Sequence, residues 1–176
     1  MTATRAVSLQ LHAGSACPPV QSIAVLLARH GRSLTLAYAV TGAISDLILP
    51  APEAPERTDE LWRSTCFEAF VRGPDEAYLE FNLAPSTRWA AYAFDRYRAG
   101  MRNADVTAPR IETRREARKF TLATTLELPD NAQALALSAI IETRDGGKAY
   151  WALAHPAGKP DFHHAAGFVF ALGDGA

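Results

Sequence analysis

The sequence predicts an all-β protein, an antiparallel two-sheet β-sandwich of jelly-roll type with roughly ten strands. Two observations support this fold class. Apolar residues alternate with polar ones in short runs along most of the chain, and turn-forming residues separate these runs at regular intervals. Because successive side chains of a strand point to opposite faces, such runs indicate strands with one face in a core.

The first clear hairpin is expected near residue 31. The run 23–27 presents Ile, Val and Leu at every second position, and the run 34–40 presents Leu, Leu, Tyr and Val in the same way. Between them, residues 30–33 (HGRS) contain a glycine, which tight turns favour. The two runs therefore predict adjacent antiparallel strands.

The C-terminal half repeats this alternation. Runs at 120–128, 135–141 and 150–153 predict three strands, and residues 145–148 (DGGK) predict the turn between the last two. A final strand is expected over 168–172. These runs complete the set of strands that a sandwich requires.

Two other segments are expected to lie outside the strands. Residues 50–60 (PAPEAPERTDE) are too rich in proline for a central strand and predict an extended connection. Residues 155–164 (HPAGKPDFHH) predict an ordered loop, because their prolines restrict the backbone.

Length, charge and cysteine content limit the possible classes of protein. The 176 residues predict a single domain, 1–176, large enough to bury a core without disulfides, so Cys17 and Cys66 are expected to be free thiols. A formal net charge of −1 gives no reason to expect nucleic acid as a partner. The chain shows neither the apolar run of a signal peptide nor a membrane-spanning run, which predicts a cytoplasmic protein with no membrane partner.

Residues 61–98 are the most informative segment, with two Trp, four Phe and three Tyr. Within it, the runs 66–71 and 78–83 predict a hairpin whose turn contains Gly73 and Pro74. The apolar face of this hairpin carries Phe67, Val71, Leu79, Phe81 and Leu83, and the other face carries Glu68, Glu80 and Asn82. A slip of one residue would bury both acids in the core, so the pattern also predicts the register.

The second face of this hairpin combines acids with aromatic side chains. Two carboxylates at cross-strand distance repel each other unless a cation, a metal ion or ligand hydroxyls lie between them. The arginines of the segment that could neutralise them are Arg72, Arg88, Arg96 and Arg98. A structural network with one arginine and a ligand site are both consistent with this pattern. Aromatic platforms beside fixed polar groups are typical of sites that hold a flat polar ligand such as a sugar ring.

Four segments carry a resemblance to a known family. The runs LWRSTCFEAF, YLEFNLAPS, WAAYAFDRYR and WALAHPAGKPDFHH resemble bacterial DOMON-like proteins related to family 9 carbohydrate-binding modules. The resemblance spans about residues 55–170 and implies a sandwich whose concave face receives a ligand. It implies that Trp62 forms one wall of a slot, and that Glu68, Glu80 and Asn82 form its polar floor.

A second aromatic wall is expected from a late loop. Phe162 is the best candidate in this sequence, with His163 and Trp151 behind it, and Arg98 would donate to ligand hydroxyls. The predicted ligand-binding residues are therefore Trp62, Glu68, Glu80, Asn82, Arg98, Phe162 and His163. The expected function is non-catalytic binding of a small polar ligand, a saccharide or a glycan fragment, without a cofactor.

Two alternative functions remain open at this level. Some DOMON domains bind haem through Met and His ligands, and Met101 with His155 or His163 could supply such a pair. Glu68 and Glu80 could instead act as the acid and base of glycoside hydrolysis. The sequence contains no nucleophile motif that would favour an enzyme.

Two ion-binding hypotheses are weaker. His155, His163 and His164 could hold a metal ion together with Asp161, and a calcium-like ion could brace a loop. The five basic residues within 110–119 could bind phosphate, but they alternate with glutamates, which is typical of a solvated hairpin. The sequence therefore predicts no metal site.

Overall fold

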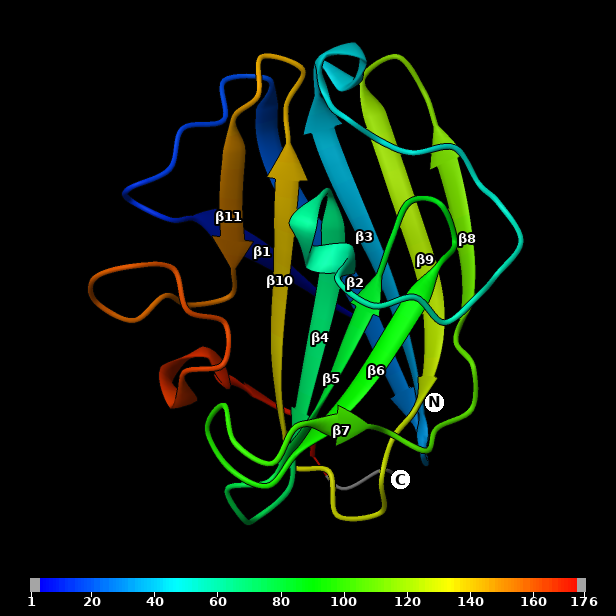
Figure 1. Ribbon diagram of the computed structural model, residues 1–176, viewed down its shortest axis with the longest axis vertical. Helices are drawn as coiled ribbons and strands as arrows, with labels where there is room; N and C mark the ends of the chain where they lie inside the picture. Colours follow the sequence, from blue (N-terminus) through cyan, green and yellow to red (C-terminus); the bar gives the residue numbers. More distant parts are fainter. Residues whose placement is uncertain (1–3, 174–176) are drawn as a thin grey trace.

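The computed structural model describes residues 4–173 and shows an all-β protein (Figure 1). Its strands are β1 (Arg5–Leu11), β2 (Val20–His30), β3 (Ser33–Gly42), β4 (Cys66–Arg72), β5 (Tyr78–Leu83), β6 (Trp89–Phe94), β7 (Arg102–Asn103), β8 (Arg110–Arg115), β9 (Lys119–Glu127), β10 (Ala134–Glu142), β11 (Lys148–Ala152) and β12 (Phe170–Ala171). Within these residues the helices are the 3-10 turns η1 (Ile44–Asp46), η2 (Leu61–Arg63) and η3 (Ala165–Gly167). None of the helices described is long and apolar enough to cross a membrane. The ends of the expected domain, residues 1–3 and 174–176, lie outside the described residues.

The described strands form one antiparallel sheet that curls into a half-barrel. Eleven of them follow the order β7-β6-β5-β4-β10-β11-β1-β2-β3-β9-β8, and β12 pairs with β10. Strand β1 joins the two halves: residues 5–9 pair with β2, whereas Gln10 and Leu11 pair with Ala152 and Trp151 of β11. A sandwich of two separate sheets, as expected from the sequence, is therefore not confirmed. Alternation predicts which face a side chain occupies, but it does not predict which strands are hydrogen-bonded neighbours.

The predicted turns are confirmed. His30 pairs with Ser33 across the β2–β3 turn, where Gly31 has a φ of 56°, a left-handed conformation that glycine adopts without steric cost. Strands β4 and β5 are joined around Gly73, and β10 and β11 around Gly146. Residues 50–60 form the expected extended connection.

The last strand is shorter than expected, because β12 contains only Phe170 and Ala171. Strand β11 already occupies residues 138–142 on the same edge of β10, so β12 can pair only with Ala134 and Leu135. The segment just before it folds into η3 instead of extending. The full run 168–172 is therefore not a strand.

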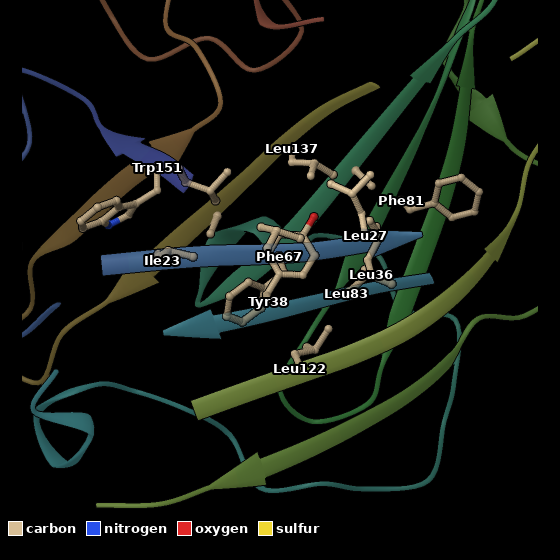
Figure 2. Close-up of a cluster of buried hydrophobic side chains, with 14 of the residues drawn as sticks. Ile23, Leu27, Leu36, Tyr38, Phe67, Phe81, Leu83, Leu122, Leu137 and Trp151 are labelled. Carbon is tan, nitrogen blue, oxygen red and sulfur yellow. The ribbon is translucent and has the colours of Figure 1, made fainter. Parts of the chain in front are cut away.

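The main core lies between the two halves of the sheet (Figure 2). Phe67 pairs with Leu83, and Val71 pairs with Leu79, so the apolar face of the β4–β5 hairpin points into this core as predicted. From the opposite half, the Tyr38 ring lies 5.1 Å from the Phe67 ring, measured between centroids. The Tyr38 hydroxyl donates a hydrogen bond of 2.8 Å to the backbone oxygen of Glu68, which joins the halves through a polar contact as well.

The position of Phe67 predicts a large effect of its truncation. Phe67→Ala should lower the free energy of unfolding by about 3–5 kcal/mol, because it leaves a cavity between the two halves. Urea unfolding measures this change. Leu26→Ala is the control, since Leu26 is 51% exposed on β2, and it should change stability by less than about 0.5 kcal/mol. If both variants lost the same amount of unfolding free energy, the core would not lie where Phe67 places it.

Candidate functional site

Strands β4, β5 and β6 are buried on both faces. Their inner face contributes to the main core, and their outer face carries a second apolar cluster formed with β10 and the C-terminal segment. The buried members of this cluster are Phe70, Tyr78, Ala90, Tyr92, Phe94, Ala136 and Phe168. Three segments lie over this face: η2, which is seen in front of β4 in Figure 1, the β6–β7 loop, and the loop that follows β11.

A cleft of about 470 Å³ lies between this face and the segments that cover it. It is lined by Trp62, Glu68, Glu80, Tyr92, Phe94, Arg98, Met101, Ile140, Tyr150, Pro160, Phe162 and His163. Six of the seven predicted ligand-binding residues are therefore brought together, although they come from five separate parts of the chain. The exception is Asn82, which is fully buried and does not line the cleft.

The aromatic walls come from different elements. Trp62 on η2 is 46% exposed, whereas Trp89 and Trp151 are 7% and 6% exposed and pack in the main core. Trp151, a lower-ranked candidate for the second aromatic wall, therefore does not line the cleft. Side chains alternate along β11, so Tyr150 faces the cleft instead, and its ring lies 6.1 Å from that of Phe162.

The carboxyl groups of Glu68 and Glu80 form the floor of the cleft. Glu68 lies opposite Asn82 in the β4–β5 register, and its Oε2 accepts a hydrogen bond of 3.0 Å from the Ser138 hydroxyl. The Asn82 amide donates to Oε1 of Glu80 at 2.8 Å. Asn82 was expected to face the ligand, but it is fully buried, does not line the cleft, and positions Glu80 through this hydrogen bond.

Burial changes the acidity of both groups. Burial, together with the nearby charge of Glu80, raises the pKa of Glu68 well above its usual value, which the Ser138 hydrogen bond only partly offsets. Burial also raises the pKa of Glu80 to about 6, although the Asn82 hydrogen bond and Arg98 act in the opposite direction. At pH 7 Glu80 is therefore mostly a carboxylate, and burial disfavours the charged form of Glu68.

His163 lies next to Glu80 but does not neutralise it. Burial, with a contribution from Arg98, lowers the pKa of His163 to about 4, so the ring is neutral at pH 7. The backbone N–H of Arg98 donates to the Tyr78 oxygen at 3.2 Å, and the same oxygen lies 2.7 Å from His163 Nδ1, within hydrogen-bond distance. Nε2 then faces Oε2 of Glu80 at 3.7 Å, beyond hydrogen-bond distance.

Arg98 contributes a cation to the cleft, but an acid in the late loop already matches its charge. Its guanidinium donates to Oδ1 of Asp161 at 2.8 Å, and the Tyr97 hydroxyl donates to Oδ2 at 2.6 Å. Burial alone would raise the pKa of Asp161, but these hydrogen bonds outweigh it and keep the pKa below its usual value. The result is a bridge between the β6–β7 loop and the late loop, which lie side by side at the lower left of Figure 1.

The other candidate arginines have partners elsewhere. The Arg72 guanidinium lies 4.6 Å from the Phe168 ring centroid, and Arg88 forms a surface ion pair with Glu53 at 2.9 Å. Arg96 is exposed in the β6–β7 loop. Among the described residues, no arginine forms an ion pair with Glu68 or Glu80, and the arginine that reaches the cleft pairs with Asp161.

The remaining histidines of the late loop hold the backbone. His155 Nε2 lies 2.8 Å from the Gln10 carbonyl oxygen, and His12 Nε2 lies 2.9 Å from that of Gly158, so the loop is tied to β1 and the residue that follows it. His164 Nδ1 accepts the Ala166 N–H at the start of η3. Across residues 4–173 no group of three or more His, Cys, Asp or Glu side chains is arranged to hold a metal ion.

Several residues of the cleft were not expected from the sequence as ligand contacts, among them Tyr92, Phe94 and Tyr150. The alternation of β6 could have identified two of them. Tyr92 pairs directly with Glu80 in the β5–β6 register, and Phe94 is two positions further along the same face. The Tyr92 hydroxyl donates to Oδ1 of Asp59 at 2.6 Å, which orients this ring.

Comparison with known proteins identifies the fold but not a family. No family model and no curated protein matches the chain. Among solved structures, the chain is similar to a proposed carbohydrate-binding protein from Bacteroides uniformis, with a TM-score of 0.61 and 14% sequence identity. The match covers 94% of this chain and 84% of that chain. The two proteins therefore share a fold.

The location of the three tryptophans predicts how their truncation affects stability. Trp89→Ala and Trp151→Ala should each lower the free energy of unfolding by about 3–5 kcal/mol, because each would leave a cavity in the core. Of the three variants, Trp62→Ala should lower the free energy of unfolding the least. Melting midpoints of the three variants give the ranking, and Trp62→Ala as the most destabilised would place this residue in the core.

The raised pKa of Glu80 predicts a pH-dependent gain in stability for Glu80→Gln. The pKa rises from its ordinary 4.5 to about 6 on folding, so the folded protein holds this proton more tightly. The contribution of Glu80 to stability is therefore present below pH 4.5 and is lost as pH rises through 6. The free energy of unfolding of Glu80→Gln, measured relative to that of the wild type, should rise by roughly 2 kcal/mol between pH 4 and pH 7.

Urea unfolding at both pH values measures this gain. Glu76→Gln is the matched control, because Glu76 is exposed in the neighbouring β4–β5 turn. The difference in unfolding free energy between Glu80→Gln and the wild type should change across this pH range. A constant difference would contradict the assigned burial of the carboxyl group.

Proposed function

We propose that the cleft binds a saccharide or a glycan fragment and does not convert it chemically. The observation that carries this proposal is the pairing of aromatic walls, Trp62 and Phe162, with a floor of buried carboxyl groups, Glu68 and Glu80. The fold likeness to a proposed carbohydrate-binding protein supports the same function. So does the sequence resemblance to DOMON-like proteins related to carbohydrate-binding modules.

The chemistry of the cleft suits a sugar ring. Aromatic faces stack on the apolar C–H side of a sugar, while carboxyl oxygens accept hydrogen bonds from its hydroxyls. The volume of about 470 Å³ falls within the range of small-molecule sites, about 300–1,000 Å³. A mono- or disaccharide unit, rather than a long chain, is the proposed occupant.

The geometry favours binding over hydrolysis. Glycoside hydrolysis requires two carboxyl groups that flank the scissile bond. Glu68 and Glu80 instead project from adjacent strands onto the same floor. A haem ligand is also disfavoured, because His163 Nδ1 is bonded to Tyr78 and its Nε2 faces Glu80.

A thermal-shift screen against mono- and disaccharides, followed by calorimetry, tests this function. A ligand at 100 times its Kd should stabilise the protein by about 2.7 kcal/mol, because only the folded state binds. Trp62→Ala should weaken binding at least about tenfold, since it removes a stacking face. Leu26→Ala, which alters the far half of the sheet, should bind like the wild type.

The proposal fails if no saccharide raises the melting midpoint, or if Trp62→Ala binds as well as the wild type. Release of a hydrolysed product during incubation would replace it with the enzyme alternative. A visible absorption band in freshly purified protein would replace it with the haem alternative.

A further inference from the structure

The floor of the cleft has a negative charge that the protein does not balance. Arg98 is the cationic side chain that lines the cleft, and its guanidinium is paired with Asp161. His163 is neutral because of its burial. In the part of the chain that the structure describes, Glu80 therefore has no cationic partner, and Glu68 lies beside it on the next strand.

Each of these acids also has one oxygen without a protein donor. Glu80 uses Oε1 for Asn82, and its Oε2 is 3.7 Å from His163 Nε2. Glu68 uses Oε2 for Ser138, and no hydrogen bond to its Oε1 is present among residues 4–173. Glu68 and Glu80 are only 3% and 6% exposed, so water solvates them poorly. Two poorly solvated carboxyl oxygens thus face the cleft without a protein donor.

The rings around these oxygens have a matching electrostatic preference. Trp62, Tyr92, Phe94, Tyr150 and Phe162 all line the cleft. The face of an aromatic ring carries partial negative charge and attracts a cation, most strongly where water is excluded. Rings and carboxyl groups therefore both favour a positively charged ligand group, and both disfavour an anionic one.

We propose that the cleft selects a ligand with a primary ammonium group, and that its saccharide is an amino sugar with a free amine. The ammonium would lie between Glu68 and Glu80 and donate to their free oxygens, while the sugar ring stacks on Trp62 or Phe162. This inference rests on the proposed function for the sugar part. The preference for an ammonium group rests on the floor alone.

The test is calorimetry at about pH 7 with matched probes that differ only at one position. Glucosamine, N-acetylglucosamine and glucose form one set, and the corresponding galactose and mannose sets cover the other ring configurations. In at least one set the free amine should bind at least about tenfold tighter than both the acetylated and the hydroxyl sugar. Cyclohexylamine provides an ammonium group on a ring without hydroxyls.

Variants of the floor identify the group responsible. Glu80→Gln should reduce the preference for the amine over the hydroxyl sugar to about twofold or less, because it removes the charge but keeps the shape. Glu68→Gln should reduce the preference less, because burial raises the pKa of Glu68 well above its usual value and so disfavours its charged form. Glu76→Gln, an exposed acid outside the cleft, should retain the full preference. Melting midpoints establish that each variant is folded.

The outcomes separate this inference from the proposed function. Equal affinity for amino and hydroxyl sugars, or a preference that Glu80→Gln leaves intact, would overturn the ammonium selectivity and leave saccharide binding in place. Binding of cyclohexylamine without binding of any sugar would overturn the saccharide function and support the selectivity. Failure of every probe to bind would overturn both.

Discussion

The cleft depends on a pair of strands, β4 and β5, that are buried on both faces. Their apolar side chains, such as Phe67 and Phe81, fill the core between the halves of the sheet. Because side chains alternate, Glu68 and Glu80 must then project to the other face, which η2 and two loops cover. Neither acid can move into water without displacing a core residue by one position. Desolvation of the carboxyl groups is thus a direct consequence of core packing.

The polar groups around the acids are arranged so that they do not relieve this desolvation. Asp161 takes the charge of Arg98, and burial keeps His163 neutral at pH 7 while Tyr78 contacts its Nδ1. A protein selected for stability alone would be expected to place a cation beside Glu80. Groups with shifted pKa values in a cleft are typical of functional sites, where stability is lost in exchange for binding or chemistry.

Local alternation was sufficient to predict much of this arrangement. It predicted the two faces of the β4–β5 hairpin and the turns at Gly31 and Gly146, whereas the exposed position of Trp62 was implied by the resemblance to DOMON-like proteins. It could not predict that the sheet is continuous, because that depends on two residue pairs between β1 and β11, which are far apart in the sequence. Strand β1 itself was not identified in advance.

The orientation of adjacent aromatic residues was also beyond the sequence. Tyr150 and Trp151 are neighbours, so either could face the cleft, and the register of Trp151 with Ala139 of β10 decides that Trp151 packs inward. Likewise, Asn82 is fully buried, with its amide bonded to Glu80 and its oxygen accepting from Cys66. Both features come from contacts between distant segments, which alternation within one strand cannot predict.

The attachment of the late loop to the N-terminal region has a consequence for how the protein folds. His155 contacts Gln10 and His12 contacts Gly158, across separations of 145 and 146 residues. Such contacts have the highest entropic cost of loop closure and form slowly. During synthesis the hairpins of β2–β3 and β4–β5 can form as they emerge from the ribosome, whereas Phe162 and His163 can be positioned only after nearly the whole chain is available. The cleft is therefore expected to be among the last parts of the molecule to assemble, and a nascent chain would have its sheet hairpins before it had a complete binding site.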